Sequence, residues 1–245
     1  MTDFATACAT HFPGTRPADD YVAATVAATR AHGFTADNTI ACVGLCRDEM
    51  SRALRRTIQE AWGEAFNFGG LAGMLFLGRT GFMAAHAHAP IEGGRERYVY
   101  YAMPHIALGA QGEIGVCRRP GRSEPSKACG ALEAFLNELR GGRVRLTLDP
   151  LDLEQTILQQ RLMEVVPHDH WPDLVEITHA AHDVIRADLI RMIELTVDPA
   201  QADYAVFTGV KIHGPDGGYV QPRDAWAMVG GVRTKLDLGV PAAAR

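Results

Sequence analysis

The chain has 245 residues, of which 47% are hydrophobic and 22% charged, and its formal net charge is −5. This composition is typical of a globular protein with a full core, and it excludes a disordered or fibrous chain. Acidic and basic residues are interleaved without a basic stripe, and no apolar run approaches the roughly 20 residues that span a bilayer. We therefore expect neither a nucleic-acid partner nor a membrane span.

The predicted elements alternate between helices and strands along the chain. Apolar residues at helical spacing predict helices over residues 18–32, 48–62, 126–142, 150–166 and 172–197. Each of these stretches begins near polar residues and ends at a glycine or where the helical spacing stops. Asp48 and Ser126 are the expected N-caps of the second and third. Apolar and aromatic runs predict strands over residues 39–45, 95–108, 203–218 and 225–238, with a hairpin turn at 110–112.

Two further features bear on domain organisation. Residues 66–81 contain five glycines without a phosphate-binding fingerprint, which indicates closely packed backbone. The sequence has neither an internal repeat nor a linker rich in Pro, Gly or Ser. We therefore expect one α/β domain over residues 1–245, with residues 1–17 and 238–245 at its periphery.

Five cysteines, at positions 8, 42, 46, 117 and 129, are an odd number at irregular spacing, which favours a reducing compartment and thiols used for packing or metal. Cys46 ends a predicted strand. Cys129 stands at a predicted helix start, where the dipole favours thiolate. With His86 and His88, these thiols offer the ligand types that zinc prefers. Their spacing is not local, so by itself it leaves open whether they bind metal or pack in the core.

Other chemistries are less well supported by the sequence. Glu176, His179, His182 and Asp183 lie at helical spacings of three and four, as in di-iron bundles, but the required second copy of the motif is missing. His105, in an apolar context, is interpreted as a core histidine bonded to backbone. The chain has no G-x-S-x-G elbow and no C-x-x-C pair.

A family resemblance is carried by the segments VGLCRDEM, FGGLAGMLFLGRTGF, AHAHAP, RERYVYYAMPHIA, SKACGA and YAVFTGVKIHGPDGG. Over residues 31–232 the chain resembles the limiting-CO2-inducible B/C proteins of algae. This implies a fold like that of β-class carbonic anhydrases, with a central, mostly parallel sheet flanked by helices. It also implies Zn2+ in a Cys-His-Cys triad, CO2 and bicarbonate as substrates, and a homodimer or a larger assembly with a related subunit.

The resemblance further implies a CO2-concentrating role in the chloroplast, in the stroma or around the pyrenoid. Carried over by motif, the zinc ligands are Cys46, His88 and Cys129, with Asp48 as the catalytic acid. His88 is preferred to His86 because it stands two residues before the proline of AHAHAP. An acceptor such as Asp48 would orient water at the open position of the metal.

The sequence departs from the family pattern at two positions. Met50 stands where the C-x-D-x-R pattern of β-class enzymes has arginine, so the partner of Asp48 is not identified. Arg47 occupies a place where a small residue such as serine is common. In the substrate pocket it could cross the mouth, hold bicarbonate or pair with Asp48, or else it could point to solvent. The protein is therefore expected to be a zinc-dependent carbonic anhydrase or, alternatively, a weakly active zinc-bearing subunit that serves as scaffold or binds bicarbonate.

Overall fold

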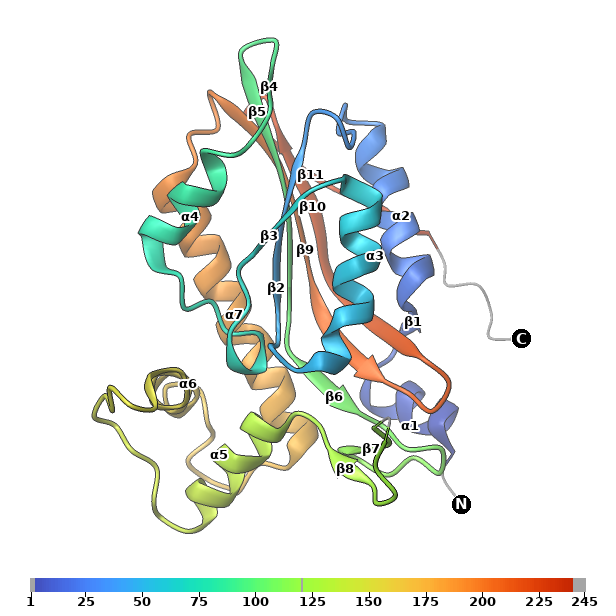
Figure 1. The fold of residues 1–245 in the computed structure, drawn as a ribbon, viewed down its shortest axis with the longest axis vertical. Coiled ribbons are helices and arrows are strands. Elements are labelled where there is room, and N and C mark those ends of the chain that lie inside the picture. The colour runs from blue at the N-terminus through green and yellow to red at the C-terminus, as the bar shows by residue number, and fades with distance from the viewer. Residues whose placement is uncertain (1–2, 120, 240–245) are drawn as a thin grey trace.

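The computed structural model describes residues 3–119 and 121–239, and within them the strands form a nine-stranded sheet and a small two-stranded one (Figure 1). The strands are β1 (Arg16–Pro17), β2 (Ile40–Leu45), β3 (Ala65–Asn67), β4 (Ile91–Glu92), β5 (Arg95–Met103), β6 (His105–Ala107), β7 (Val116–Cys117), β8 (Ser126–Lys127), β9 (Ala202–His213), β10 (Gly218–Val229) and β11 (Val232–Lys235). The helices are α1 (Phe4–His11), α2 (Ala18–Arg30), α3 (Arg52–Trp62), α4 (Gly78–His86), α5 (Gly130–Arg140), α6 (Leu153–Met163) and α7 (Leu174–Thr196), with short 3-10 turns η1 (Glu49–Ser51) and η2 (Leu71–Gly73).

The large sheet has the order β1-β10-β9-β5-β2-β3. Neighbours from β9 to β3 run parallel, and β6 also pairs with β9 in parallel. Strands β1, β4, β10 and β11 add antiparallel pairs around this centre. The prediction of an α/β domain with a central, mostly parallel sheet flanked by helices is confirmed.

Helices cover both faces of this sheet, with α2 and α3 on one side and α4 and α7 on the other (Figure 1). Because side chains alternate along a strand, β2 supplies both cores. Ala41, Val43 and Leu45 pack with α2 and α3, whereas Ile40 and Cys42 belong to the core that includes α4, α5, α6 and α7. All six residues of β2 are buried, which explains why this strand reads as a continuous apolar run.

Some helix boundaries differ from the sequence prediction. Asp48 does cap a helical segment, but that segment begins as the 3-10 turn η1 before α3. Ser126 was expected to cap the third helix, and this is wrong: Ser126 lies in β8, its hydroxyl accepts a hydrogen bond from Arg119, and Cys129 takes the N-cap position of α5. Helix α4 was not predicted. The hairpin is confirmed in part, since Leu108 bridges Ile114 around the turn.

Two glycines of the segment 66–81 confirm its close packing. A Cβ atom on Gly69 would lie 1.7 Å from the carbonyl oxygen of Leu45, and one on Gly73 would lie 2.3 Å from that of Met103. Gly73 also has a φ of 85°, which favours glycine. The chain therefore passes directly against the carboxyl ends of β2 and β5.

The terminal segments were expected at the periphery. At the amino end, Ala7, Cys8 and Phe12 are nevertheless buried in a cluster with Ile106 and Val210, so α1 contributes to a small core. At the carboxyl end, residues 240–245 lie outside the described residues.

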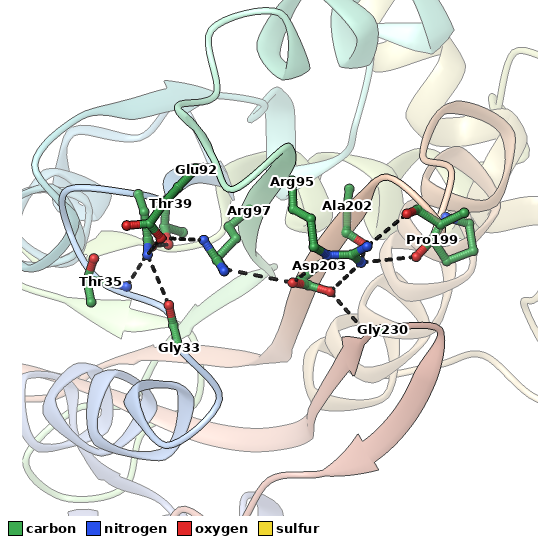
Figure 2. A network of polar contacts seen from close by, with 12 residues as sticks. Gly33, Thr35, Thr39, Glu92, Arg95, Arg97, Pro199, Ala202, Asp203 and Gly230 are labelled. Carbon is green, nitrogen blue, oxygen red and sulfur yellow. Dashed lines mark hydrogen bonds and ion pairs between the residues drawn. The ribbon is translucent and has the colours of Figure 1, made fainter.

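The amino ends of β5 and β9 are joined by a polar network around Asp203 (Figure 2). Its buried carboxylate accepts hydrogen bonds from Arg95 at 2.6 and 3.1 Å and from the Gly230 N–H at 2.8 Å. Burial would raise the pKa of Asp203, but these hydrogen bonds outweigh it and the pKa is lowered. The charged carboxylate therefore stabilises the folded state.

Replacing Asp203 with asparagine is expected to destabilise the fold by about 2 kcal/mol at neutral pH, because hydrogen bonds to a charged acceptor are lost. The pKa is lower in the folded than in the unfolded chain, so this stabilisation is present above roughly pH 4 and lost as the pH falls through the folded-state value. Urea unfolding should show a difference from the unsubstituted chain that shrinks in acid. The exposed Asp37→Asn variant is the control, and a pH-independent difference would contradict the assignment.

Candidate metal centre

Three buried side chains form a candidate metal site. Cys46, His105 and Cys129 each place one ligand atom within 4.8 Å of the others. Their exposed fractions are 4%, 1% and 2%. Within residues 3–119 and 121–239, this is the single group of three or more Cys, His, Asp or Glu side chains that could hold a metal ion.

The parallel sheet brings Cys46 and His105 together. Leu45 of β2 lies opposite Met103 of β5, and the two chains then continue beyond the same sheet edge. Cys46 follows Leu45 directly, and His105 follows Met103 by two residues. The carboxyl ends of neighbouring parallel strands are where α/β folds place their sites.

Backbone hydrogen bonds bring Cys129 to the same place. The residue before it, Ala128, accepts a hydrogen bond from the Ala107 N–H of β6 at 3.1 Å and donates to the Gly115 carbonyl at 3.0 Å. This fixes Cys129, the N-cap of α5, next to the strand that carries His105.

The two ring nitrogens of His105 differ in their surroundings. Nδ1 is hydrogen-bonded to Nε2 of His213 at 2.8 Å. Nε2 is buried and has no hydrogen-bond partner among the described residues. His105 is therefore buried, as interpreted from the sequence, but the interpretation is wrong in one respect: its hydrogen-bond partner is the His213 side chain and not the backbone. An imidazole nitrogen left free beside two thiols is the donor set that zinc prefers, so the residues present fit this metal.

The two thiols influence each other strongly. Hydrogen bonding from Cys129, and the imidazole of His105 nearby, lower the pKa of Cys46 against the opposing effect of burial. The same interaction and burial raise the pKa of Cys129. The N–H groups of Ala131 and Leu132 act in the opposite direction, as expected at a helix start, but they are outweighed. The helix start thus acts on Cys129 in the predicted direction, but the pKa of Cys129 is raised overall.

His88, the ligand expected from the family motif, is not part of this group. It is exposed in the turn after α4, where its ring centroid lies 5.7 Å from that of Phe66. His86 is buried at the end of α4 and is hydrogen-bonded to the Tyr100 hydroxyl at 2.7 Å. The structure therefore brings the imidazole of His105, the first residue of β6, next to the two sulfurs, and it does not bring His88 there.

The alternative cluster on α7 is used for other contacts. Glu176 forms a capping box with Asp173 at the start of the helix. His182 is hydrogen-bonded to the Thr208 hydroxyl at 3.0 Å, and His179 to Arg223 at 2.7 Å. These side chains do not form a metal group in the described part of the chain.

Asp48 is paired with an arginine that sequence reasoning did not identify. Arg119, in the loop after β7, donates from Nη2 to Oδ2 at 2.7 Å and from Nη1 to Oδ1 at 3.1 Å. The Met50 N–H donates to Oδ1 at 2.9 Å. Burial would raise the pKa of Asp48, but these hydrogen bonds outweigh it and the pKa is lowered. Asp48 is thus a fixed, ionised acceptor two residues from Cys46.

Arg47 points away from Asp48. Its guanidinium forms an ion pair with Glu154 of α6, whose carboxylate also accepts from the Leu71 N–H at 3.0 Å. The Arg47 side chain remains 58% exposed. Of the possibilities open from the sequence, this arrangement agrees with a side chain at the solvent boundary and not with a salt bridge to Asp48.

Pockets lie beside Met50 next to this centre. One, of about 480 Å³, is lined by Met50, Lys211 and His213 among others. Another, of about 240 Å³, is lined by Met50 and Cys117. Neither is lined by Arg47, the residue expected in the substrate pocket. Lys211 donates to the Met50 carbonyl, and burial lowers the pKa of this lysine to about 7.

Comparison with known proteins shows which family the chain resembles in sequence and structure. A family model described as limiting CO2-inducible proteins B/C beta carbonic anhydrases matches residues 15–229. The crystal structure of limiting CO2-inducible protein LCIB is 39% identical, with a TM-score of 0.79, and the match covers 94% of this chain and 97% of that chain. The crystal structure of PtLCIB4, a homologue of LCIB, is 24% identical with a TM-score of 0.83, covers 95% and 99% of the two chains, and supports the fold alone.

None of the curated proteins matches the chain. Across the described ranges, no helix combines the length and apolar character needed to cross a bilayer. The family match extends over most of the sequence and the LCIB match over nearly all of it. The chain therefore belongs to the limiting CO2-inducible protein B/C family of β-carbonic anhydrases.

Proposed function

We propose that this protein binds Zn2+ through Cys46, His105 and Cys129 and interconverts CO2 and bicarbonate. The observation that carries the proposal is the buried group of two thiols and one imidazole, whose Nε2 atom has no hydrogen-bond partner among the described residues. Family membership supports the same substrate pair. The proposed ligand set differs from the motif assignment only in His105, which replaces His88.

Zinc bound there would supply the Lewis acidity that makes water a nucleophile at neutral pH. The protein contributes a charged acceptor beside it. Because an ionised carboxylate can only accept hydrogen bonds, Asp48 can orient the hydroxyl of water or bicarbonate but not donate to it. The two hydrogen bonds from Arg119 hold this carboxylate in one direction and in its charged form. Arg119 thus serves as the arginine that the Met50 position lacks.

A second candidate is a zinc-bearing subunit with little hydration activity. The observation that favours it is the exposed cation at Arg47, directly after the ligand Cys46. Opposite charges attract, so an exposed guanidinium next to a metal ligand can retain the bicarbonate anion and slow turnover. Its ion pair with Glu154 reduces this effect, because the carboxylate competes for the cation.

A stopped-flow CO2 hydration assay on zinc-loaded protein separates the two candidates. We expect measurable hydration by the unsubstituted chain and a rate about tenfold higher for Arg47→Ser, an effect of about 1.4 kcal/mol on the barrier. Arg56→Ser is the matched control, because Arg56 is an exposed ion-paired arginine on α3. Negligible hydration by both the unsubstituted chain and Arg47→Ser, with zinc bound, would reject the enzyme and favour the subunit.

The cellular setting and assembly also belong to this proposal. We place the protein in the CO2-concentrating mechanism of an algal chloroplast, as a dimer or a larger assembly with itself or a related subunit. Support for assembly comes from large apolar side chains exposed before and at the start of α6, namely Leu146, Leu148, Leu151 and Leu153. Sedimentation of the purified chain tests self-association, and a monomer at all concentrations would contradict it.

A further inference from the structure

His213 is held beside the candidate metal centre by the sheet. It is the last residue of β9, which pairs in parallel with β6 so that His105 lies opposite Lys211 and Ala107 opposite His213. Residues two apart on a strand share a face, so His213 and His105 project to the same side. The carbonyl of His213 also accepts from the Leu108 N–H at 2.9 Å, which fixes the end of the strand.

The two imidazoles make a direct contact. His105 Nδ1 and His213 Nε2 are 2.8 Å apart, and the ring planes are inclined by 88°. Both side chains are buried. One nitrogen of such a pair must carry the proton and the other must accept it, so the contact selects a tautomer for each ring.

The chemistry of metal binding settles the direction of this hydrogen bond. A neutral imidazole that offers the Nε2 lone pair to a metal carries its proton on Nδ1. In His105 that proton then points at His213 Nε2, which accepts it. A metal-bound histidine usually donates its second N–H to a carboxylate, a carbonyl or water, and removal of such a partner weakens metal binding.

We propose that His213 is a positioning residue of the metal centre, which fixes the tautomer and ring orientation of His105 so that Nε2 faces Cys46 and Cys129. The inference rests on the proposed zinc binding but not on CO2 hydration. His213 is also among the residues that line the pocket of about 480 Å³. This role is additional to the three ligands and to the pair formed by Asp48 and Arg119.

The test compares His213→Phe, which keeps a ring but has no acceptor, with His213→Gln, whose amide oxygen can accept. Zinc affinity is measured by competition with a chromophoric chelator, and the absorption bands of the Co2+-loaded protein report the ligand geometry. We expect His213→Phe to lower zinc affinity about 10- to 100-fold and to shift the Co2+ bands. His213→Gln should recover most of the affinity. His86→Phe, the same change at a buried histidine bonded to a hydroxyl, should bind zinc normally.

The proposal is overturned if His213→Phe binds zinc as tightly as the unsubstituted chain, or if His213→Gln binds no better than His213→Phe. Circular dichroism and thermal melting show whether each variant folds. If His213→Phe does not fold, His213→Asn takes its place, because its shorter side chain cannot reach Nδ1 of His105, and the same two outcomes apply. A chain that binds zinc as expected but hydrates no CO2 would reject the proposed activity and leave the role of His213 standing.

Discussion

Replacement of His105 by alanine is expected to weaken zinc binding strongly, whereas replacement of His88 leaves it intact. His105 supplies the imidazole that lies within 4.8 Å of the two cysteine sulfurs, and His88 is exposed after α4. Structural zinc sites bind with about 10–16 kcal/mol shared among their ligands, so the loss of one costs about 3 kcal/mol or more. That is at least roughly a hundredfold in the dissociation constant. Metal analysis after dialysis, followed by chelator competition, measures the effect.

The cysteines provide the matched controls. Cys46→Ala and Cys129→Ala should lose zinc to a similar extent, because each removes one sulfur of the group. Cys117→Ala should keep it, because Cys117 is a buried free thiol that contacts Ser126 instead. If His88→Ala lost the metal and His105→Ala retained it, the motif-based ligand set would be correct and the geometric one wrong.

The strand and both cysteines could be anticipated from the sequence for physical reasons. A continuous apolar run followed by a charged helix start predicts a buried strand with Cys46 at its carboxyl end, and β2 has this form. Cys129 stands before a helix whose glycine pair marks its end, and it is the N-cap of α5. The local sequence pattern was sufficient for Cys46 and Cys129 because each of them lies at the boundary of a strand or helix.

His105 was missed because its environment reads as core. It is in fact fully buried, and the apolar sequence around it gives no sign of a nearby sulfur. The usable signal was topological: residues 95–108 form a strong strand, and a histidine at its carboxyl end can meet the end of a neighbouring parallel strand. Strand neighbours are not readable from one sequence, so this inference needed the register between Leu45 and Met103.

Helix α4 and Arg119 were missed for other reasons. Two glycines, Gly78 and Gly81, lower the helix propensity of residues 78–86, but burial of Phe82 and Ala85 against the core stabilises the helix. Arg119 is separated from Asp48 by 71 residues and lies in a loop without a pattern. Such a pair is created by the fold, and no local spacing predicts it.

Replacement of Asp48 by asparagine is expected to keep zinc but lower CO2 hydration by at least roughly a hundredfold, the range seen when a positioned acid or base is lost. Asparagine keeps the shape but presents an NH2 group, which donates where the carboxylate accepts. Arg119→Leu should have a smaller effect, about tenfold, because Asp48 remains but loses both hydrogen bonds that orient it. Arg119→Lys should not restore the rate, since an ammonium cannot make the paired contact.

Zinc content and stopped-flow hydration must be measured on the same samples, because an acid two residues from Cys46 could also affect the ligand. The comparison is made in whichever background hydrates CO2, the unsubstituted chain or Arg47→Ser. Glu49→Gln is the matched control. Glu49 contacts the same Arg119 but is exposed, so its charge contributes little to the orientation of the Asp48 carboxylate. If Asp48→Asn kept both zinc and the full hydration rate, Asp48 would have no role in the reaction, and its pair with Arg119 would be a structural ion pair between η1 and the loop after β7.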